Sequence, residues 1–221
     1  MSKGSSRQEA TTISTYTDLG AQTKEAYDIS LRSRTLARQV VGDRNIEDRI
    51  RQRCSVAVGD FVMADLMRFQ NGPVAAGLEA VKRGALIITD IRMVEVGIQK
   101  LGHYCPVICA LDHGEELAKD MGITRTSAGF LALKERVEGS IVVIGNAPSA
   151  LLTICQMIGD GIRPALVVGI PVGFVNAKES KEVLRTMAVP SISCEGTRGG
   201  TPVAVAALNE IITIHSERQD A

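Results

Sequence analysis

The sequence predicts an α/β fold in which helices cover both faces of a five-stranded parallel sheet, a three-layer arrangement with extra helices at the N-terminus. From about residue 85 onward, short apolar runs alternate with segments of helical periodicity. The runs are continuously apolar, as expected of parallel strands buried on both faces. Two of them stop at Gly145 and Gly169, and a polar or Gly/Pro-bearing loop follows each. Loops in that position form binding sites at the carboxyl edge of a parallel sheet.

Ahead of this alternating region, the chain is predicted to be helical. Residues 1–18 are rich in Ser and Thr, lack periodicity and are expected to form a mobile arm. Asn45 suits the N-cap position of the second helix. The predicted helices are, in order, about Gly20–Val41, Ile46–Val58, a short stretch from Gly59-Asp60 to Arg68, and Gly72-Pro73 to Gly84.

The alternating region supplies the predicted sheet. Its strands are Ala85–Thr89, Pro106–Ala110, Ser140–Ile144, Ala165–Val168 and Pro190–Ser193. The helices between and after them are about Arg92–Leu101, Gly114–Met121, Thr126–Val137, Ser149–Gly159, Ala177–Met187 and a last helix from Gly200 to about Ile214. Neither an internal repeat nor a linker divides the chain, so residues 19–216 are expected to form a single domain.

The composition argues against several classes of partner. The 25 Lys and Arg residues balance the 25 Asp and Glu residues, so no overall charge attracts nucleic acid or an anionic membrane. No apolar run approaches the roughly 20 residues that a transmembrane helix needs. The five cysteines are odd in number and scattered, which favours reduced thiols in a cytoplasmic protein. Because the overall charge is balanced, an anionic ligand would have to be bound by local positive or N–H groups.

The loop Gly145–Ala150 is the first candidate binding element. Gly145 allows close approach of the backbone, and the Asn146 side chain offers both a donor and an acceptor. Pro148 suits the first helical turn, whose free N–H groups would hold a carboxylate or phosphate. The alternative is an ordinary strand-to-helix loop with a capped helix. The G-x-G-x-x-G spacing of a dinucleotide site is absent.

Two further candidate loops follow the last two strands. The first is Gly169–Asn176. Its Phe174 side chain either lies against a flat ligand or fills the core, and residue type alone favours the core. In the second, Glu195–Thr201, the backbone at Gly199 and Gly200 would form an anion-binding nest, and Arg198 would add a bidentate donor for a carboxylate. The alternative there is a flexible turn with a solvated arginine.

The segment Thr124–Gly129 begins a predicted helix. Its hydroxyl side chains are expected to cap that helix. Arg125 stands near the positive end of the helix, where the helix dipole does not favour a cation. This position indicates a role for Arg125 other than stability.

Four side chains able to ligate a metal occur close together in the sequence: His103, Cys105, Cys109 and His113. Their spacing lacks the Cys-x-x-Cys pair of closed zinc sites. Cys105 and Cys109 flank or lie in a buried strand, where cysteine behaves as a small hydrophobic residue. No metal site is therefore expected.

Five segments, in order, resemble the precorrin-8X methylmutases, also called precorrin isomerases, of cobalamin biosynthesis. They are Ala85–Gly97 (ALIITDIRMVEVG), Gly122–Ala128 (GITRTSA), Gly145–Leu151 (GNAPSAL), Ile170–Lys181 (IPVGFVNAKESK) and Gly199–Asn209 (GGTPVAVAALN). The resemblance implies a flavodoxin-like homodimer that needs no cofactor and isomerises precorrin-8X or its cobalt-containing counterpart. The reaction that the resemblance implies moves a methyl group from carbon 11 to carbon 12 of the macrocycle and gives hydrogenobyrinate or cobyrinate.

The resemblance also implies a pocket for a broad, flat corrinoid fringed with carboxylates. Met93, Val172 and Phe174 would supply apolar faces, whereas Arg125 and Arg198 would bind carboxylates at the edge. The residues expected to form this pocket are Ser33, Met93, Arg125, Thr126, Gly145, Asn146, Val172, Gly173, Phe174, Arg198, Gly199 and Gly200.

One position departs from the family pattern. The resemblance implies a His, three residues before a Gly in the second helix, that protonates a ring nitrogen of the substrate. The matching residue is Val56, three residues before Gly59, and a valine cannot transfer a proton. Three explanations fit: an engineered substitution that traps a bound corrinoid, a non-catalytic tetrapyrrole carrier, or another acid such as His103 or Cys54 combined with favourable binding geometry. The predicted fold by itself also suggests a phosphate or nucleotide protein, although fold does not specify ligand.

Overall fold

The computed structural model of the protein describes residues 23–219. The predicted arm, residues 1–18, lies outside this part. The helices are α2 (Lys24–Val41), α3 (Ile46–Val58), α4 (Val62–Leu66), α5 (Pro73–Lys82), α6 (Arg92–Gly97), the 3-10 turn η1 (Ala110–Asp112), α7 (Glu115–Met121), α8 (Arg125–Ala132), α9 (Lys134–Val137), α10 (Pro148–Gly159), α11 (Ala177–Thr186) and α12 (Thr201–Gln219). The strands are β1 (Met67–Gln70), β2 (Ile87–Thr89), β3 (Val107–Cys109), β4 (Ile141–Ile144), β5 (Leu166–Gly169) and β6 (Ser191–Cys194).

The first two described helices form where the sequence offers caps. At the start of α2, the Ala26 N–H donates a hydrogen bond to the Thr23 Oγ1 atom (3.2 Å). At the start of α3, the Asp48 N–H donates one to the Asn45 Oδ1 atom (3.0 Å), so the predicted N-cap role of Asn45 is confirmed. Gly59 ends α3 in the left-handed conformation (φ 64°), which glycine adopts at little cost.

The sheet has six strands in the order β1-β6-β5-β4-β2-β3. The five predicted strands are present, each within a few residues of its predicted bounds, and they pair in parallel. The prediction of a purely parallel five-stranded sheet is nevertheless wrong. A sixth strand, β1, pairs antiparallel with β6, from Met67 opposite Cys194 to Gln70 opposite Ser191.

The four residues of β1 carry little strand pattern in the sequence, which predicts a helix as far as Arg68. Only Met67 is fully buried in β1, and the other three residues are half-buried. Pairing satisfies backbone groups of β6 that an open sheet edge would leave unpaired. The Arg68 guanidinium then forms an ion pair with Glu195, directly after β6 (2.7 Å). Tertiary pairing therefore decides the conformation of this segment.

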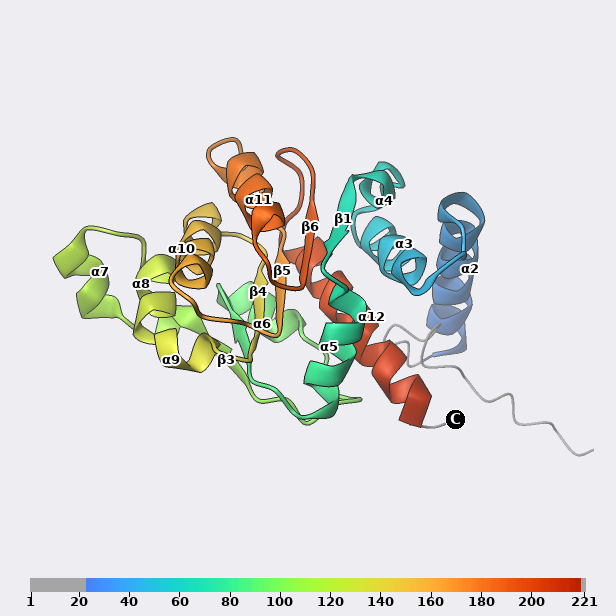
Figure 1. The fold of residues 1–221 in the computed structure, drawn as a ribbon. Coiled ribbons are helices and arrows are strands. Elements are labelled where there is room, and N and C mark those ends of the chain that lie inside the picture. The colour runs from blue at the N-terminus through green and yellow to red at the C-terminus, as the bar shows by residue number, and fades with distance from the viewer. Residues whose placement is uncertain (1–22, 220–221) are drawn as a thin grey trace, which may run out of the picture.

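Helices cover both faces of the sheet, as predicted (Figure 1). One apolar core lies between the sheet and α5, α6 and α12, and it extends to α3. A second core lies between the opposite face and α8, α10 and α11. Along β4, Ile141 and Val143 belong to the first core, whereas Val142 and Ile144 belong to the second.

α12 is the most enclosed helix of the first core. It lies between the sheet and α3, so most of its residues from Val203 to His215 are buried. It runs to Gln219 rather than ending near Ile214. The helix predicted over Thr126–Val137 instead forms α8 and α9. None of the described helices combines the length and apolar character that crossing a bilayer requires.

Candidate functional site

The loops singled out in the sequence lie at the carboxyl edge of the parallel strands. They follow β4, β5 and β6. Two hydrogen bonds join the loop after β5 to the loop after β6. The Gly173 N–H donates to the Thr197 carbonyl (3.1 Å), and the Gly200 N–H donates to the Ile170 carbonyl (2.9 Å). These two loops therefore form one surface.

The buried carboxylate of Asp90 binds the backbone of the loop after β4. Asp90, directly after β2, accepts hydrogen bonds from the N–H groups of Gly145 (3.2 Å), Asn146 (2.8 Å) and Ala147 (2.9 Å). Burial raises the pKa of the Asp90 carboxyl, and the three N–H donors oppose that rise. These three loop N–H groups already have an acceptor, so they are not open to a ligand anion; the N–H groups of the first turn of α10, which begins at Pro148, are not among them.

Close packing around Gly145 brings further elements to this edge. A Cβ atom at this position would lie 2.9 Å from the Thr201 Cα atom at the start of α12 and 2.9 Å from a methyl group of Val94 in α6. The predicted close approach of the backbone at Gly145 is thus confirmed. The neighbouring Asn146 is exposed at the surface.

The start of α8 lies beside the start of α10. Thr124 caps α8 through its hydroxyl, as predicted, and the same oxygen lies 2.9 Å from the Ser149 Oγ atom and 3.2 Å from the hydroxyl of buried Thr126. Arg125 is exposed and donates from Nη2 to the Leu111 carbonyl (3.2 Å). It forms no ion pair with the described residues, so its charge is available to an anion.

Three apolar side chains of the expected pocket are exposed at this edge. The exposed fraction is 61% for Met93 in α6, and 44% and 95% for Val172 and Phe174 in the loop after β5. The preference for Phe174 in the core, based on residue type, is therefore wrong. Large apolar side chains exposed at this edge are available to a ligand or partner.

The loop after β6 has an engaged cation and two unusual glycines. Arg198 forms an ion pair with Asp60 (3.0 Å). Gly199 and Gly200 have φ values of 141° and 109°. Because the Gly200 N–H donates to Ile170, the two glycine N–H groups do not share the predicted anion-binding nest. Within residues 23–219, only the Gly199 N–H of this pair has no hydrogen-bond acceptor.

Val56 lies half-buried in the last turn of α3. Asp60, just beyond that helix, binds Arg198, so this end of α3 lies beside the loop after β6. Ser33 is not brought to the same edge within one chain. It lies on α2, which packs against α3 on the side away from the sheet (Figure 1).

The two residues considered as substitute acids are engaged elsewhere. Cys54 is fully buried against α12, with its Sγ atom 3.6 Å from the Val203 carbonyl, and burial raises the pKa of its thiol. His103 accepts a hydrogen bond at Nδ1 from the Cys105 N–H (3.0 Å), so the network assigns its proton to Nε2, which donates to the Gln99 carbonyl (2.6 Å). His103 also precedes β3 and so lies toward the amino edge of the sheet.

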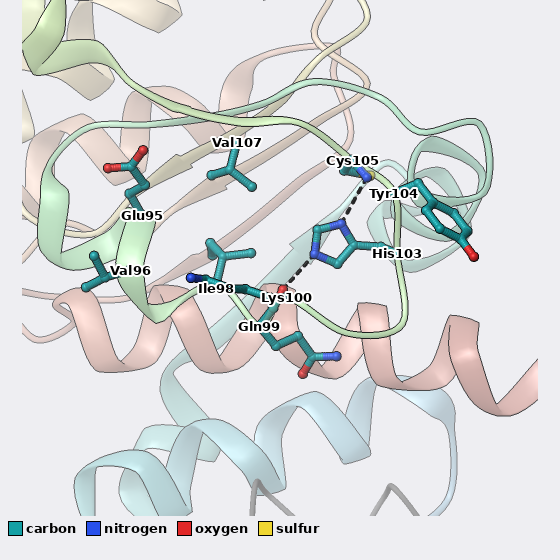
Figure 2. A pocket seen from close by; sticks show the side chains of 9 residues that line it. All are labelled: Glu95, Val96, Ile98, Gln99, Lys100, His103, Tyr104, Cys105 and Val107. Carbon is teal, nitrogen blue, oxygen red and sulfur yellow. Dashed lines mark hydrogen bonds between the residues drawn. The ribbon is translucent and has the colours of Figure 1, made fainter.

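An open pocket of about 480 Å³ lies beside α6 and the segment before β3 (Figure 2). Its lining residues are Glu95, Val96, Ile98, Gln99, Lys100, His103, Tyr104, Cys105 and Val107. It includes none of the residues expected to bind the corrinoid. No group of three or more His, Cys, Asp and Glu side chains gathers as a metal site in the part of the chain that the structure describes.

Two buried charged residues at the carboxyl edge were not singled out from the sequence. Asp90 gives a visible signal, because it is a carboxylate directly after an apolar strand. Lys181 is fully buried, and its Nζ atom donates to the Arg198 carbonyl (2.5 Å). Its signal is a lysine on the same helix face as Ala177 and Leu184, which are both buried.

Comparison with known proteins identifies the family. A family profile described as precorrin-8X methylmutase matches residues 28–214. The chain belongs to this family. The matched range includes every residue expected in the pocket, and also Val56.

Individual relatives match over most of their length. A cobalt-precorrin-8 methylmutase of Methanocaldococcus jannaschii is 42% identical over 206 residues, which cover 88% of this chain and 96% of the relative. A precorrin-8X methylmutase of Pseudomonas aeruginosa is 40% identical over 173 residues, which cover 75% and 83%. The solved structure of a precorrin-8X methylmutase from Thermus thermophilus has a TM-score of 0.79 and 36% identity, and the match covers 86% of this chain and 97% of that one.

Proposed function

We propose that this protein is a precorrin-8X or cobalt-precorrin-8 methylmutase of cobalamin biosynthesis. It isomerises the macrocycle by moving a methyl group from carbon 11 to carbon 12, which gives hydrogenobyrinate or cobyrinate. The similarity to the M. jannaschii relative over 88% of this chain and 96% of that protein carries the proposal. Because fold alone does not specify a ligand, it matters that the family match includes the loops at the carboxyl edge.

The surface chemistry of these loops supports a corrinoid ligand. A corrinoid is flat and largely apolar, with carboxylates around its rim. Met93, Val172 and Phe174 are exposed, and they can cover an apolar face. Arg125 and Arg198 can bind rim carboxylates as bidentate donors. Since the formal net charge is zero, attraction must come from such local groups.

The two arginines would engage the substrate differently. Arg125 forms no ion pair with the described residues, so a substrate carboxylate meets its charge directly. Arg198 already pairs with Asp60 at 3.0 Å, so a substrate carboxylate must share or replace that partner. We therefore expect Arg125→Ala to weaken corrinoid binding. Unchanged affinity in a spectroscopic titration would show that Arg125 is only a surface residue.

Catalysis by this chain would depend on orientation rather than on proton transfer from α3. Val56 has no proton to give, Cys54 is buried against α12, and both ring nitrogens of His103 are hydrogen-bonded. The methyl shift is intramolecular, so the reaction needs no external methyl donor. Holding the migrating methyl group over its acceptor carbon can supply a large part of the acceleration.

We propose that the active form is a homodimer. Ile29, Leu36 and Val40 share one face of α2, and all three are exposed. Ser33 falls on the same face, so a partner subunit would bring it to a pocket that its own chain does not. An apolar stripe on a surface helix favours burial against a second chain. Sedimentation equilibrium should give twice the monomer mass; a monomer at micromolar concentration would contradict this assembly.

The strand order supports the flavodoxin-like expectation. Without β1, the parallel strands follow the order 2-1-3-4-5, which is that of flavodoxin-like folds. The order reverses between β2 and β4, where such folds place their ligand crevice. The five free, buried cysteines support a cytoplasmic location, because the cytoplasm keeps thiols reduced.

The deciding experiment is turnover of precorrin-8X, followed by the visible spectrum of the corrinoid. We expect many product molecules per protein molecule. A Val56→His variant serves as the comparison, because an imidazole at this position restores a proton donor. Binding without turnover in the unmodified protein, together with turnover in V56H, would instead identify a tetrapyrrole carrier. No binding of corrinoid by either protein would refute the proposal.

A further inference from the structure

Lys181 is a buried lysine for which the proposed reaction has no assigned use. It lies on α11, on the face that also carries the buried residues Ala177, Ser180 and Leu184. Its exposed fraction is 0%. Removing an ammonium group from water is costly unless the protein supplies strong partners. Its partners therefore show what this lysine does.

The partners of Lys181 belong to the end of β6 and the loop after it. The Nζ atom donates to the Arg198 carbonyl (2.5 Å) and lies 3.4 Å from the Cys194 Sγ atom. The Cys194 thiol also donates to the Arg198 carbonyl (3.0 Å). Among the described residues, no carboxylate lies within 4.0 Å of Nζ, and the nearby Arg185 is of the same charge. The burial of Lys181 is therefore compensated mainly at one backbone carbonyl.

That carbonyl belongs to a segment with little conformational restraint of its own. Gly196, Gly199 and Gly200 all have φ values in the left-handed region, at 69°, 141° and 109°. Glycines lose more conformational freedom on folding than other residues, so such a loop needs external restraints to keep one geometry. Among the described residues Arg198 has three: Asp60 binds its guanidinium at 3.0 Å, and the Lys181 ammonium and the Cys194 thiol both donate to its carbonyl.

We propose that Lys181 is a positioning residue for the corrinoid site, which fixes the Arg198–Gly199 segment so that the Arg198 guanidinium and the Gly199 N–H face substrate carboxylates. This inference rests on the proposed function and adds a residue to it. No described carboxylate pairs with the Lys181 ammonium, which contacts the Arg198 carbonyl, so its charge would also favour an anionic ligand at the Arg198–Gly199 segment.

The restraint can be tested without substrate, because Lys181 binds the carbonyl that trypsin must attack to cleave after Arg198. Lys181→Met removes the donor and keeps an unbranched apolar side chain. Lys178→Met is the matched control, since Lys178 lies one turn earlier on α11, is about half exposed, and within residues 23–219 forms an ion pair only with Glu182, at 3.8 Å. Mass spectrometry of the folded proteins measures cleavage at Arg198–Gly199. We expect faster cleavage in K181M and an unchanged rate in K178M.

Titration with cobyrinate then tests the consequence for the site. Ordering a released residue on binding should weaken affinity about tenfold in K181M. K178M should bind like the unmodified protein. If K181M folds and matches the unmodified protein in both cleavage and affinity, the inference is wrong. If the unmodified protein does not bind cobyrinate, the proposed function fails, whereas the cleavage result still decides whether Lys181 restrains the loop.

A Lys181→Gln variant separates restraint from general stability. Glutamine is neutral but still offers a donor to the Arg198 carbonyl. We expect K181Q and K181M to lower the melting temperature equally. K181Q should nevertheless be cleaved more slowly by trypsin after Arg198 and should bind cobyrinate more tightly than K181M. If K181M does not fold, K181Q decides the question. A lower melting temperature with unchanged cleavage and affinity would reduce Lys181 to a stabilising residue and overturn the inference.

Discussion

Glu210→Gln should be one of the most destabilising single substitutions in this protein. Glu210, in α12, is fully buried and accepts hydrogen bonds from three arginines. Arg34 in α2 donates to it at 3.0 Å, and Arg49 and Arg53 in α3 donate at 2.9 and 3.1 Å. One carboxylate thus joins both N-terminal helices to the central helix.

The expected cost follows from the burial of these partners. Removing one member of a buried ion pair costs about 3–5 kcal/mol, because the remaining charge stays buried without its counter-ion. An amide at position 210 keeps one acceptor oxygen but leaves the guanidinium groups facing a neutral side chain. Domains are stable by only about 5–15 kcal/mol, so this change removes a large part of the total.

Urea unfolding measures this cost directly. With an m value of about 2 kcal/mol/M, the unfolding midpoint of E210Q should fall by roughly 1.5–2.5 M. Glu217→Gln is the control, because Glu217 pairs with Arg49 at 2.7 Å but is partly exposed, and such pairs contribute only about 0–1 kcal/mol. If E210Q and E217Q agree within about 1 kcal/mol, the buried carboxylate does not hold α2 and α3 in place and the reasoning is refuted.

Three further predictions concern the edge loops and the pH dependence of stability. Phe174→Ala should change the free energy of unfolding by no more than about 0.5 kcal/mol, because the ring is exposed, yet weaken cobyrinate binding roughly three- to tenfold; equal affinity in a titration would place the ring outside the site. Asp90→Asn should speed hydrogen exchange at the amides of residues 145–147 and cost about 1–3 kcal/mol; unchanged exchange would show that the carboxylate does not hold the loop. Burial lowers the pKa of His215 below its usual value of 6.5, so the unfolded chain binds the proton more tightly and stability should fall as pH drops below about 6.5. His215→Gln should lose less stability between about pH 7 and 5 in urea titrations; equal losses would exclude this group as a cause.

The parallel strands and most helices could be predicted because their patterns are local. β4 and β5 are continuous apolar runs that stop at glycine. Asn45 indicates the start of α3, because its side chain can cap a helix. β1 could not be predicted in the same way. Its conformation depends on an unpaired edge of β6, which is distant in sequence, and its four residues contain one fully buried side chain.

The sequence locates the candidate loops at strand ends, but it does not show the contacts within and between them. Gly145 was expected to allow close approach, and it meets the Thr201 backbone. Nothing in the residue type of Phe174 shows that it is exposed, because an aromatic side chain after a buried strand suits a core equally well. Likewise, the sequence places Asp90 at a strand end but does not show that its acceptors face the N–H groups of another loop.

The Asp90 carboxylate has a consequence for which ligands this crevice can take. A phosphate group approaching the N–H donors after β4 would compete with an anion attached to the same chain. Short tethers give effective concentrations on the order of millimolar or more. A nucleotide or flavin at micromolar concentration is therefore at a disadvantage of roughly a thousandfold for these donors. The strand order resembles that of nucleotide-binding folds. In this chain, however, the Asp90 carboxylate already occupies the three loop N–H groups that a phosphate would meet directly after β4.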